Sequence, residues 1–109
     1  MILPNRITIY IPHPPDKPDH YTLPAQVAEL LTDAAGGATI TEGTGYWKND
    51  EGQLIMEPVA LVAAWYADAN MGKVQRATAQ ASGLLFAQGE QVVAVETGVG
   101  LHLLDQVPA

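Results

Sequence analysis

The stretch Gly36–Pro58, GGATITEGTGYWKNDEGQLIMEP, lies near the middle of the chain and decides its fold. Its first half is rich in β-forming residues, residues 48–52 (KNDEG) are turn formers, and an apolar run follows them. The pattern predicts two strands, near 38–47 and 54–66, joined by a short turn. Gly36 and Gly37 stand where a preceding helix would end, because glycine adopts the left-handed conformation of a helix C-cap.

The flanking segments alternate between strand and helix patterns. Residues 6–11 (RITIYI) place every second residue, an isoleucine, on one face and predict a strand. Apolar residues at helical spacing predict helices near 24–35 and 70–88, the first with Thr22 as its cap and the second closed by Gly89. Residues 91–96 predict a strand, and the apolar residues 100–105 allow a short final one.

The order β-α-β-β-α-β predicts a single α+β domain over residues 1–109, with a ferredoxin-like arrangement. In this arrangement an antiparallel four-stranded sheet carries both helices on one face. The length of 109 residues fits one domain.

Composition limits the possible functions. The net charge is −7 with only five Lys and Arg, so no basic patch for nucleic acid or an anionic membrane is expected. No apolar run approaches the ~20 residues that span a bilayer, and the N-terminus shows no signal-peptide pattern. We expect a cytoplasmic protein. The absence of cysteine excludes disulfides and thiolate chemistry.

The strand after Pro58 is apolar on both faces, as are residues 91–96. An uncovered face of an antiparallel sheet normally shows alternating polar residues. A second copy of the chain is therefore the expected cover, and we expect a homo-oligomer, a trimer before a dimer. The alternative is a C-terminal tail that folds across this face.

The central hairpin holds the candidate ligand site. Gly43 and Gly45 predict a bulge, Pro58 predicts a break in the third strand, and one of Tyr46 and Trp47 is expected to be buried. A carboxylate, aromatic rings and free amides at a bulge favour a pocket; a purely structural role for the same residues stays open. The candidate ligand-binding residues are Gly43, Thr44, Gly45, Tyr46, Trp47, Lys48 and Glu57.

No catalytic constellation or metal site is predicted. Four potential ligands in the proline-rich loop, His13, Asp16, Asp19 and His20, would lie along an extended line, because a polyproline helix rises about 9 Å per turn. Ser82 lies mid-helix without a histidine partner, and His102 lies in an apolar segment. We expect no cofactor.

The central stretch resembles the signature of a bacterial domain family of unknown function. The matching residues are Gly37, Thr39, Gly43, Gly45, Trp47, Gly52, Glu57 and Pro58. Phe86, Gln88 and Val92 are similar to a later part of that signature, with Gln91 as the alternative to Gln88. The element order also resembles the wider group of PII-like and CutA-like trimers, which implies a trimeric assembly.

Three functions remain open at this stage. The first is a non-enzymatic oligomeric binding or regulatory module with a small-molecule or protein partner. The second is a small ferredoxin-like enzyme of the monooxygenase or isomerase type, with a cavity between sheet and helices and with Tyr10, Tyr46, Tyr66 and His102 as candidates. The third is an interaction or inhibitor protein carried by a mobile element.

Overall fold

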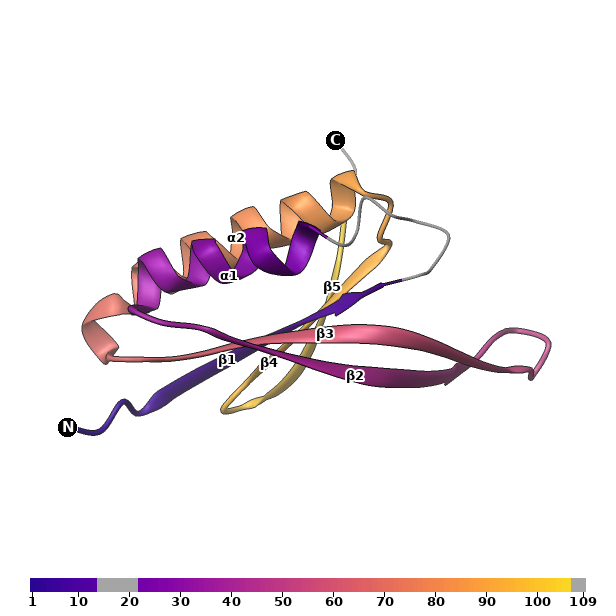
Figure 1. Cartoon of the computed structure of the whole chain (residues 1–109), viewed down its shortest axis with the longest axis horizontal. Coiled ribbons are helices and arrows are strands. Elements are labelled where there is room, and N and C mark those ends of the chain that lie inside the picture. Colours follow the sequence, from indigo (N-terminus) through magenta and orange to yellow (C-terminus); the bar gives the residue numbers. More distant parts are fainter. Residues whose placement is uncertain (14–21, 107–109) are drawn as a thin grey trace.

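The computed structural model describes residues 1–13 and 22–106, which form one antiparallel sheet with two helices on one face (Figure 1). The strands are β1 (Asn5–Pro12), β2 (Thr39–Lys48), β3 (Leu54–Tyr66), β4 (Val92–Thr97) and β5 (Gly100–Asp105). The helices are α1 (Leu23–Ala35) and α2 (Met71–Ala87), with the short 3-10 turn η2 (Asp68–Asn70) before α2. The predicted bounds agree with these to within one residue.

The predicted four-stranded sheet is wrong, because the sheet has five strands in the order β2-β3-β1-β4-β5. The apolar residues 100–105 turn back at Gly100, whose φ is +145°, and pair with β4 from Thr97 to Val92. The α+β class agrees with the prediction. None of the helices in the described part of the chain is long and apolar enough to cross a membrane.

The core lies between the helices and one face of the sheet. Ile7, Ile9 and Ile11 point toward the helices from β1, as their alternation predicts. They pack with Val27 and Leu31 of α1, all of which are buried. The other core residues are Leu23, Ala34, Ala60, Val62, Ala64, Tyr66, Val74, Ala77, Ala81, Leu85, Val93 and Val95. We call the opposite side of the sheet, which neither α1 nor α2 covers, the bare face (Figure 1).

Helix α1 begins after Thr22 and ends before Gly36, as the sequence predicts. Gly36 adopts φ 101°, and its N–H donates to the Thr32 carbonyl at 2.8 Å. Thr22 precedes the helix, but its side chain makes no capping hydrogen bond.

The β2–β3 hairpin is regular, so the predicted bulge and strand break are wrong. Residues pair one to one from Thr39 opposite Ala63 to Lys48 opposite Leu54, with Gly45 opposite Glu57. Pro58 does not interrupt this ladder. Its carbonyl accepts a bond from His13 N–H at 2.8 Å, on the β1 side. The N–H that proline lacks would point the same way, where the pairing with β1 ends.

The turn at the hairpin tip depends on one asparagine. The Asn49 side-chain oxygen accepts bonds from the N–H groups of Glu51 and Gln53, at 3.1 and 2.9 Å. Gly52 adopts φ 77°, a conformation that favours glycine. The turn predicted at residues 48–52 is therefore present.

Candidate functional site

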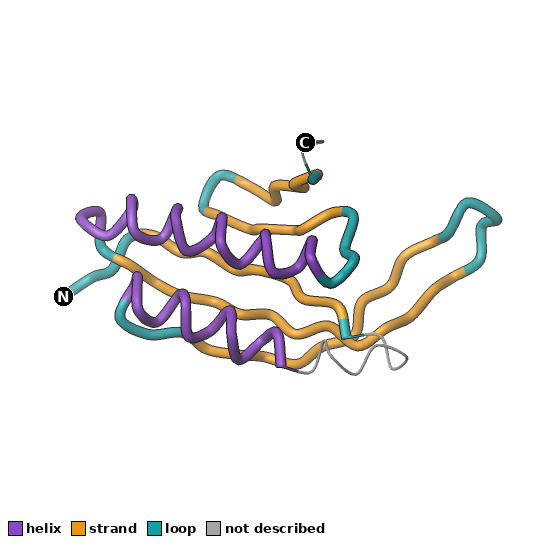
Figure 2. Tube along the Cα trace, turned by 90° about the horizontal axis from the view of Figure 1, so that it is seen from above, coloured by secondary structure: helices purple, strands orange, loops and turns teal. Residues whose placement is uncertain are grey.

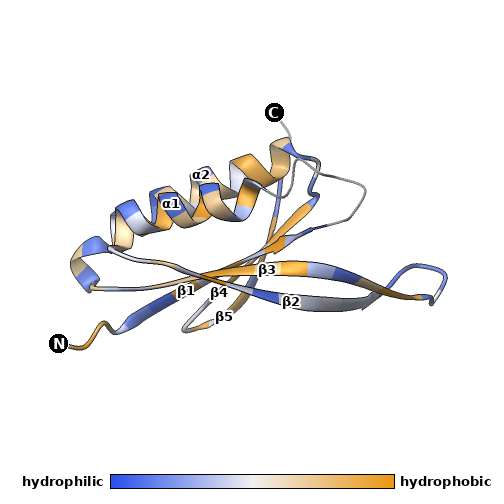
Figure 3. Cartoon of the chain, in the orientation of Figure 1, coloured by the Kyte–Doolittle hydropathy of each residue, from blue (hydrophilic) through white to orange (hydrophobic). Residues whose placement is uncertain are grey.

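The outer part of the hairpin, residues 44–57, extends past the ends of both helices (Figure 2). We call it the arm. It contributes to the elongated shape of the molecule, which measures 47 × 31 × 26 Å. Large apolar side chains on the arm are exposed, namely Tyr46, Trp47, Leu54 and Met56. Along the β3 side of the arm the hydropathy changes from hydrophilic at the base to apolar before a hydrophilic tip (Figure 3).

A hollow of about 890 Å³ lies between the arm and the β4–β5 edge of the sheet. Tyr10 of β1 and Ala94 of β4 contribute to it from the middle of the sheet. The arm supplies Gly45, Tyr46 and Trp47; the remaining lining residues are Gly89, Glu90, Gln91, Val92, Leu101 and Leu103. Most of this lining is apolar, which is typical of small-molecule sites.

The hollow brings together some of the predicted site residues. Gly45, Tyr46 and Trp47 line it, and Glu57 lies directly opposite Gly45 in the ladder. The three others lie on the same strand outside the lining, namely Gly43, Thr44 and Lys48.

The expectation that one of Tyr46 and Trp47 is buried is wrong. Their exposed fractions are 63% and 50%. They lie on opposite faces of the arm, because neighbouring residues of a strand alternate. The arm lies beyond both helices, so neither helix packs on it.

The two glycines of β2 leave space on the bare face. A Cβ added at Gly43 would meet Leu61 and Val59 side-chain atoms at 3.8 Å, which is ordinary contact. Neither Gly43 nor Gly45 has a positive φ. Backbone strain therefore does not require glycine at these positions. The absence of two side chains instead keeps this part of the face open beside Trp47.

A polar network crosses the bare face and reaches the hollow at Tyr10. The Tyr10 hydroxyl donates to Glu96 Oε1 at 2.6 Å, and Arg6 bonds to the other oxygen of the same carboxylate. The Arg6 guanidinium also lies over the Trp65 ring, 5.8 Å from its centroid. The hydrogen bond to Glu96, together with partial burial, raises the pKa of Tyr10 above its ordinary value.

The charge in the hollow is acidic. Among the lining residues that the structure describes there is one charged side chain, Glu90, and no Lys or Arg. Glu57 lies on the bare face at the base of the arm, opposite Gly45. Such a lining favours neutral or cationic ligands over phosphates.

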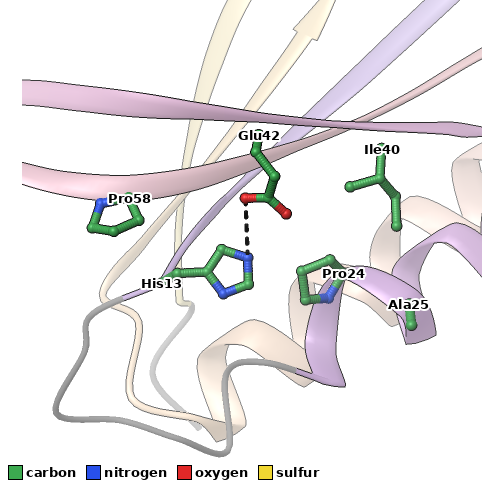
Figure 4. A pocket seen from close by; sticks show the side chains of 6 residues that line it. All are labelled: His13, Pro24, Ala25, Ile40, Glu42 and Pro58. Atoms are coloured by element: carbon green, nitrogen blue, oxygen red, sulfur yellow. Dashed lines mark ion pairs between the residues drawn. The ribbon is translucent and has the colours of Figure 1, made fainter.

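A second cavity, of about 360 Å³, lies between the N-terminus of α1 and the sheet (Figure 4). His13 is buried at this cavity, and its Nε2 lies 3.9 Å from Glu42 Oε2 on β2. Pro24, Ala25, Ile40 and Pro58 complete the lining. The sequence patterns considered above did not indicate this pairing. The available signal was position, because residues 13 and 42 continue the helix-facing alternation of β1 and β2.

The remaining catalytic or metal-ligand candidates from the sequence either make hydrogen bonds within the fold or belong to its core, where the structure describes them. Ser82 is buried and donates to the Thr78 carbonyl at 2.8 Å, and His102 lies 3.0 Å from the Thr97 hydroxyl. Tyr66 belongs to the core. Asp16, Asp19 and His20 lie outside the described residues. Residues 1–13 and 22–106 contain no cluster of three or more potential metal ligands.

Comparisons with known proteins found similarity of fold to solved structures, but no match of sequence to a family model or a curated protein. No family model matches the sequence, and the search of curated proteins found no match. The fold is similar to a phage SAM lyase in complex with S-methyl-5′-thioadenosine, with a TM-score of 0.62 at 14% identity. That match covers 94% of this chain and 89% of the lyase chain. The apo state of a phage SAM lyase gives 0.61 at 13% identity, covering 96% and 91%.

A Bacillus cereus protein related to NIF3 is also similar, with a TM-score of 0.58 at 19% identity. The match covers 94% of this chain but only 26% of that longer chain. At these identities the likeness concerns the fold alone. The chain thus shares its α+β architecture with these proteins.

Proposed function

We propose that this chain is a homo-oligomeric binding module that holds a small planar molecule in the hollow between the arm and the β4–β5 edge. The observation that carries the proposal is the hollow itself, with Trp47, Tyr46 and Tyr10 among its mostly apolar lining. Aromatic side chains bind planar rings by stacking and by burial of apolar area. The fold supports a scaffold role, because the hollow lies between elements that the sheet holds in place.

The ligand class follows from shape and charge. Gln91 supplies an amide that can donate and accept hydrogen bonds at the edge of a ring. The acidic lining disfavours phosphate groups. An adenine nucleoside without phosphates meets both conditions, and the complex of the similar phage lyase makes S-methyl-5′-thioadenosine a suitable probe.

The proposal that the chain forms a homo-oligomer is supported by exposed apolar residues on the bare face. Trp65, Leu101 and Leu103 are exposed there, and Leu61 is half-buried. The C-terminal segment does not cover this face as far as Gln106, because β5 extends the sheet at its edge. The PII-like and CutA-like resemblance favours a trimer over a dimer. We also propose that the protein is cytoplasmic and does not bind nucleic acid.

A second candidate function is a small enzyme that uses the cavity at His13. A histidine and a carboxylate at a cavity between sheet and helix are the groups that general acid–base catalysis needs. The observation that favours it is the 3.9 Å separation of His13 Nε2 and Glu42 Oε2. The residues differ from the tyrosines and His102 that the sequence suggested.

Calorimetric titration with S-methyl-5′-thioadenosine tests the first candidate. We expect saturable binding, with adenosine 5′-monophosphate at least tenfold weaker. Ala94→Phe, which fills the hollow, should weaken binding at least tenfold, or about 1.4 kcal/mol. Thr41→Phe adds the same ring to the bare face outside the lining and should leave the affinity unchanged. Absence of binding, or equal loss in both variants, contradicts a ligand in the hollow.

Incubation with SAM, followed by chromatography for S-methyl-5′-thioadenosine, tests the second candidate. Under the binding-module proposal no conversion occurs. Conversion that is lost in Glu42→Gln but kept in Glu29→Gln, a change of an exposed carboxylate on α1, would replace the first candidate with the second.

A further inference from the structure

Three carboxylates from different parts of the chain border the hollow. Glu90, in the turn after α2, is part of its lining. Glu57 of β3 pairs with Gly45, and Asp105 of β5 pairs with Val92. Both partners line the hollow, and directly paired residues of antiparallel strands lie on the same face of the sheet. Negative charge therefore approaches the hollow from the arm, from β5 and from the turn before β4.

No Lys or Arg in the described part of the chain lines the hollow. Arg6 lies on the bare face, but its guanidinium is held in an ion pair. Lys48 directly follows Trp47 on β2, so it points away from the face that carries the tryptophan. Lys73 and Arg76 belong to α2, on the other side of the sheet (Figure 1). The potential in the hollow is therefore negative, which raises the local concentration of cations.

Aromatic rings give the hollow a second attraction for positive charge. Tyr10, Tyr46 and Trp47 belong to its lining. The face of an aromatic ring attracts a cation, most strongly for tryptophan and where water is excluded. The chain already makes one such contact, because the Arg6 guanidinium lies 5.8 Å from the centroid of the Trp65 ring. Stacking alone would suit a neutral ring equally, so the rings and the carboxylates together favour a charged one.

The arrangement suits an organic cation better than a metal ion. A divalent ion needs several ligand atoms at about 2–2.6 Å. Across residues 1–13 and 22–106 the structure shows no group of three or more side chains that could hold one. A charge that is spread over a planar group is less strongly hydrated than a compact ammonium, as in the guanidinium of arginine. Such a cation enters a mostly apolar hollow at a smaller desolvation cost.

We propose that the preferred ligand of the hollow is a planar ring that itself carries a positive charge, such as an N-alkylated purine or a pyridinium. The ring stacks on Trp47, and Glu90 supplies the counter-charge. This inference rests on the proposed function, because it names the class of ligand for the same site. It goes beyond that function, which requires only a planar molecule without phosphates.

Two isomers of a methylated nucleoside test the charge preference on the wild-type protein. At pH 7 the ring of 1-methyladenosine is positively charged, whereas that of N6-methyladenosine is neutral. In calorimetric titration at low salt we expect 1-methyladenosine to bind at least tenfold more tightly. Binding of 1-methyladenosine that is no tighter than that of its isomer overturns this inference. The proposed function then stands if S-methyl-5′-thioadenosine binds, and it fails as well if no binding of that probe is detected.

A pair of variants separates charge from the shape of the methylated edge. Glu90→Gln removes the counter-charge, and Glu51→Gln makes the same change at an exposed position near the tip of the arm, outside the lining. Glu90→Gln should reduce the preference for 1-methyladenosine to about threefold or less and leave the affinity for N6-methyladenosine unchanged. Glu51→Gln should keep the full preference. A preference that survives Glu90→Gln, or that both variants lower equally, overturns the inference.

Discussion

Tyr10 links the polar network of the bare face to the hollow. Its hydroxyl donates to Glu96, whose carboxylate Arg6 also binds. The hydrogen bond restrains the Tyr10 side chain, which contributes to the lining of the hollow. A sequence pattern places Arg6, Thr8 and Tyr10 on one face of β1, but the meeting with Glu96 requires β4 to lie beside β1.

Tyr10→Phe should lower the free energy of unfolding at pH 7 by about 1 kcal/mol, because it removes a hydrogen bond to a carboxylate. The pKa of Tyr10 is raised above its unfolded value of about 10. The stabilisation is therefore fully present below pH 10 and is lost as the pH rises through the folded pKa. Urea unfolding of both proteins from pH 7 to 11 measures this difference.

Tyr46→Phe is the matched control, since Tyr46 lies exposed on the arm. It should change stability by less than about 0.5 kcal/mol. A Tyr10→Phe effect that stays constant above pH 10, or that the control equals, would contradict the assigned bond.

At the scale of elements, the arm follows from a mismatch of lengths. Helices of 13 and 17 residues span about 20 and 26 Å at 1.5 Å per residue. The 13 residues of β3 span about 43 Å at 3.3 Å per residue. A strand this long must extend beyond the helices. The strand and helix lengths predicted from the sequence already implied that the hairpin extends past the helices. The expectation that Tyr46 or Trp47 is buried did not take this length difference into account.

Local patterns predicted the bounds of the strands and helices and failed for the hairpin interior. Isoleucines at alternate positions and the glycine after α1 determine local structure, so they can be recognised in isolation. Whether Pro58 breaks a strand depends on which side its missing N–H would face. That side follows from the position of β1, which the local sequence of the hairpin does not contain.

Trp47→Ala should cost about 1 kcal/mol or less, because half of the side chain is already exposed and a small area of contact is lost. Leu31→Ala, at a fully buried position of α1, should cost about 2–5 kcal/mol. Thermal and urea unfolding compare the two variants. If Trp47→Ala destabilises the fold as much as Leu31→Ala, the tryptophan is part of the core and not a free wall of the hollow.

At the scale of the whole molecule, the functional features arise from pairings that are distant in sequence. The sequence allowed a short final strand over residues 100–105 but did not place it in the sheet, and its position beside β4 adds Leu101 and Leu103 to the hollow. His13 and Glu42 meet because β1 and β2 both flank β3. Three of the predicted site residues line the hollow because the arm carries them there, a placement that their own motif did not determine.

The central claim is that a planar ligand lies against Trp47, and the chain allows a direct measurement because it has two tryptophans. Trp65→Phe leaves Trp47 as the single fluorophore, and Trp47→Phe leaves Trp65, which lies outside the lining of the hollow. Titration with S-methyl-5′-thioadenosine should change the emission of Trp47 saturably and leave that of Trp65 unchanged. An emission of Trp47 that stays constant up to millimolar ligand, or an equal change at both tryptophans, would contradict the account.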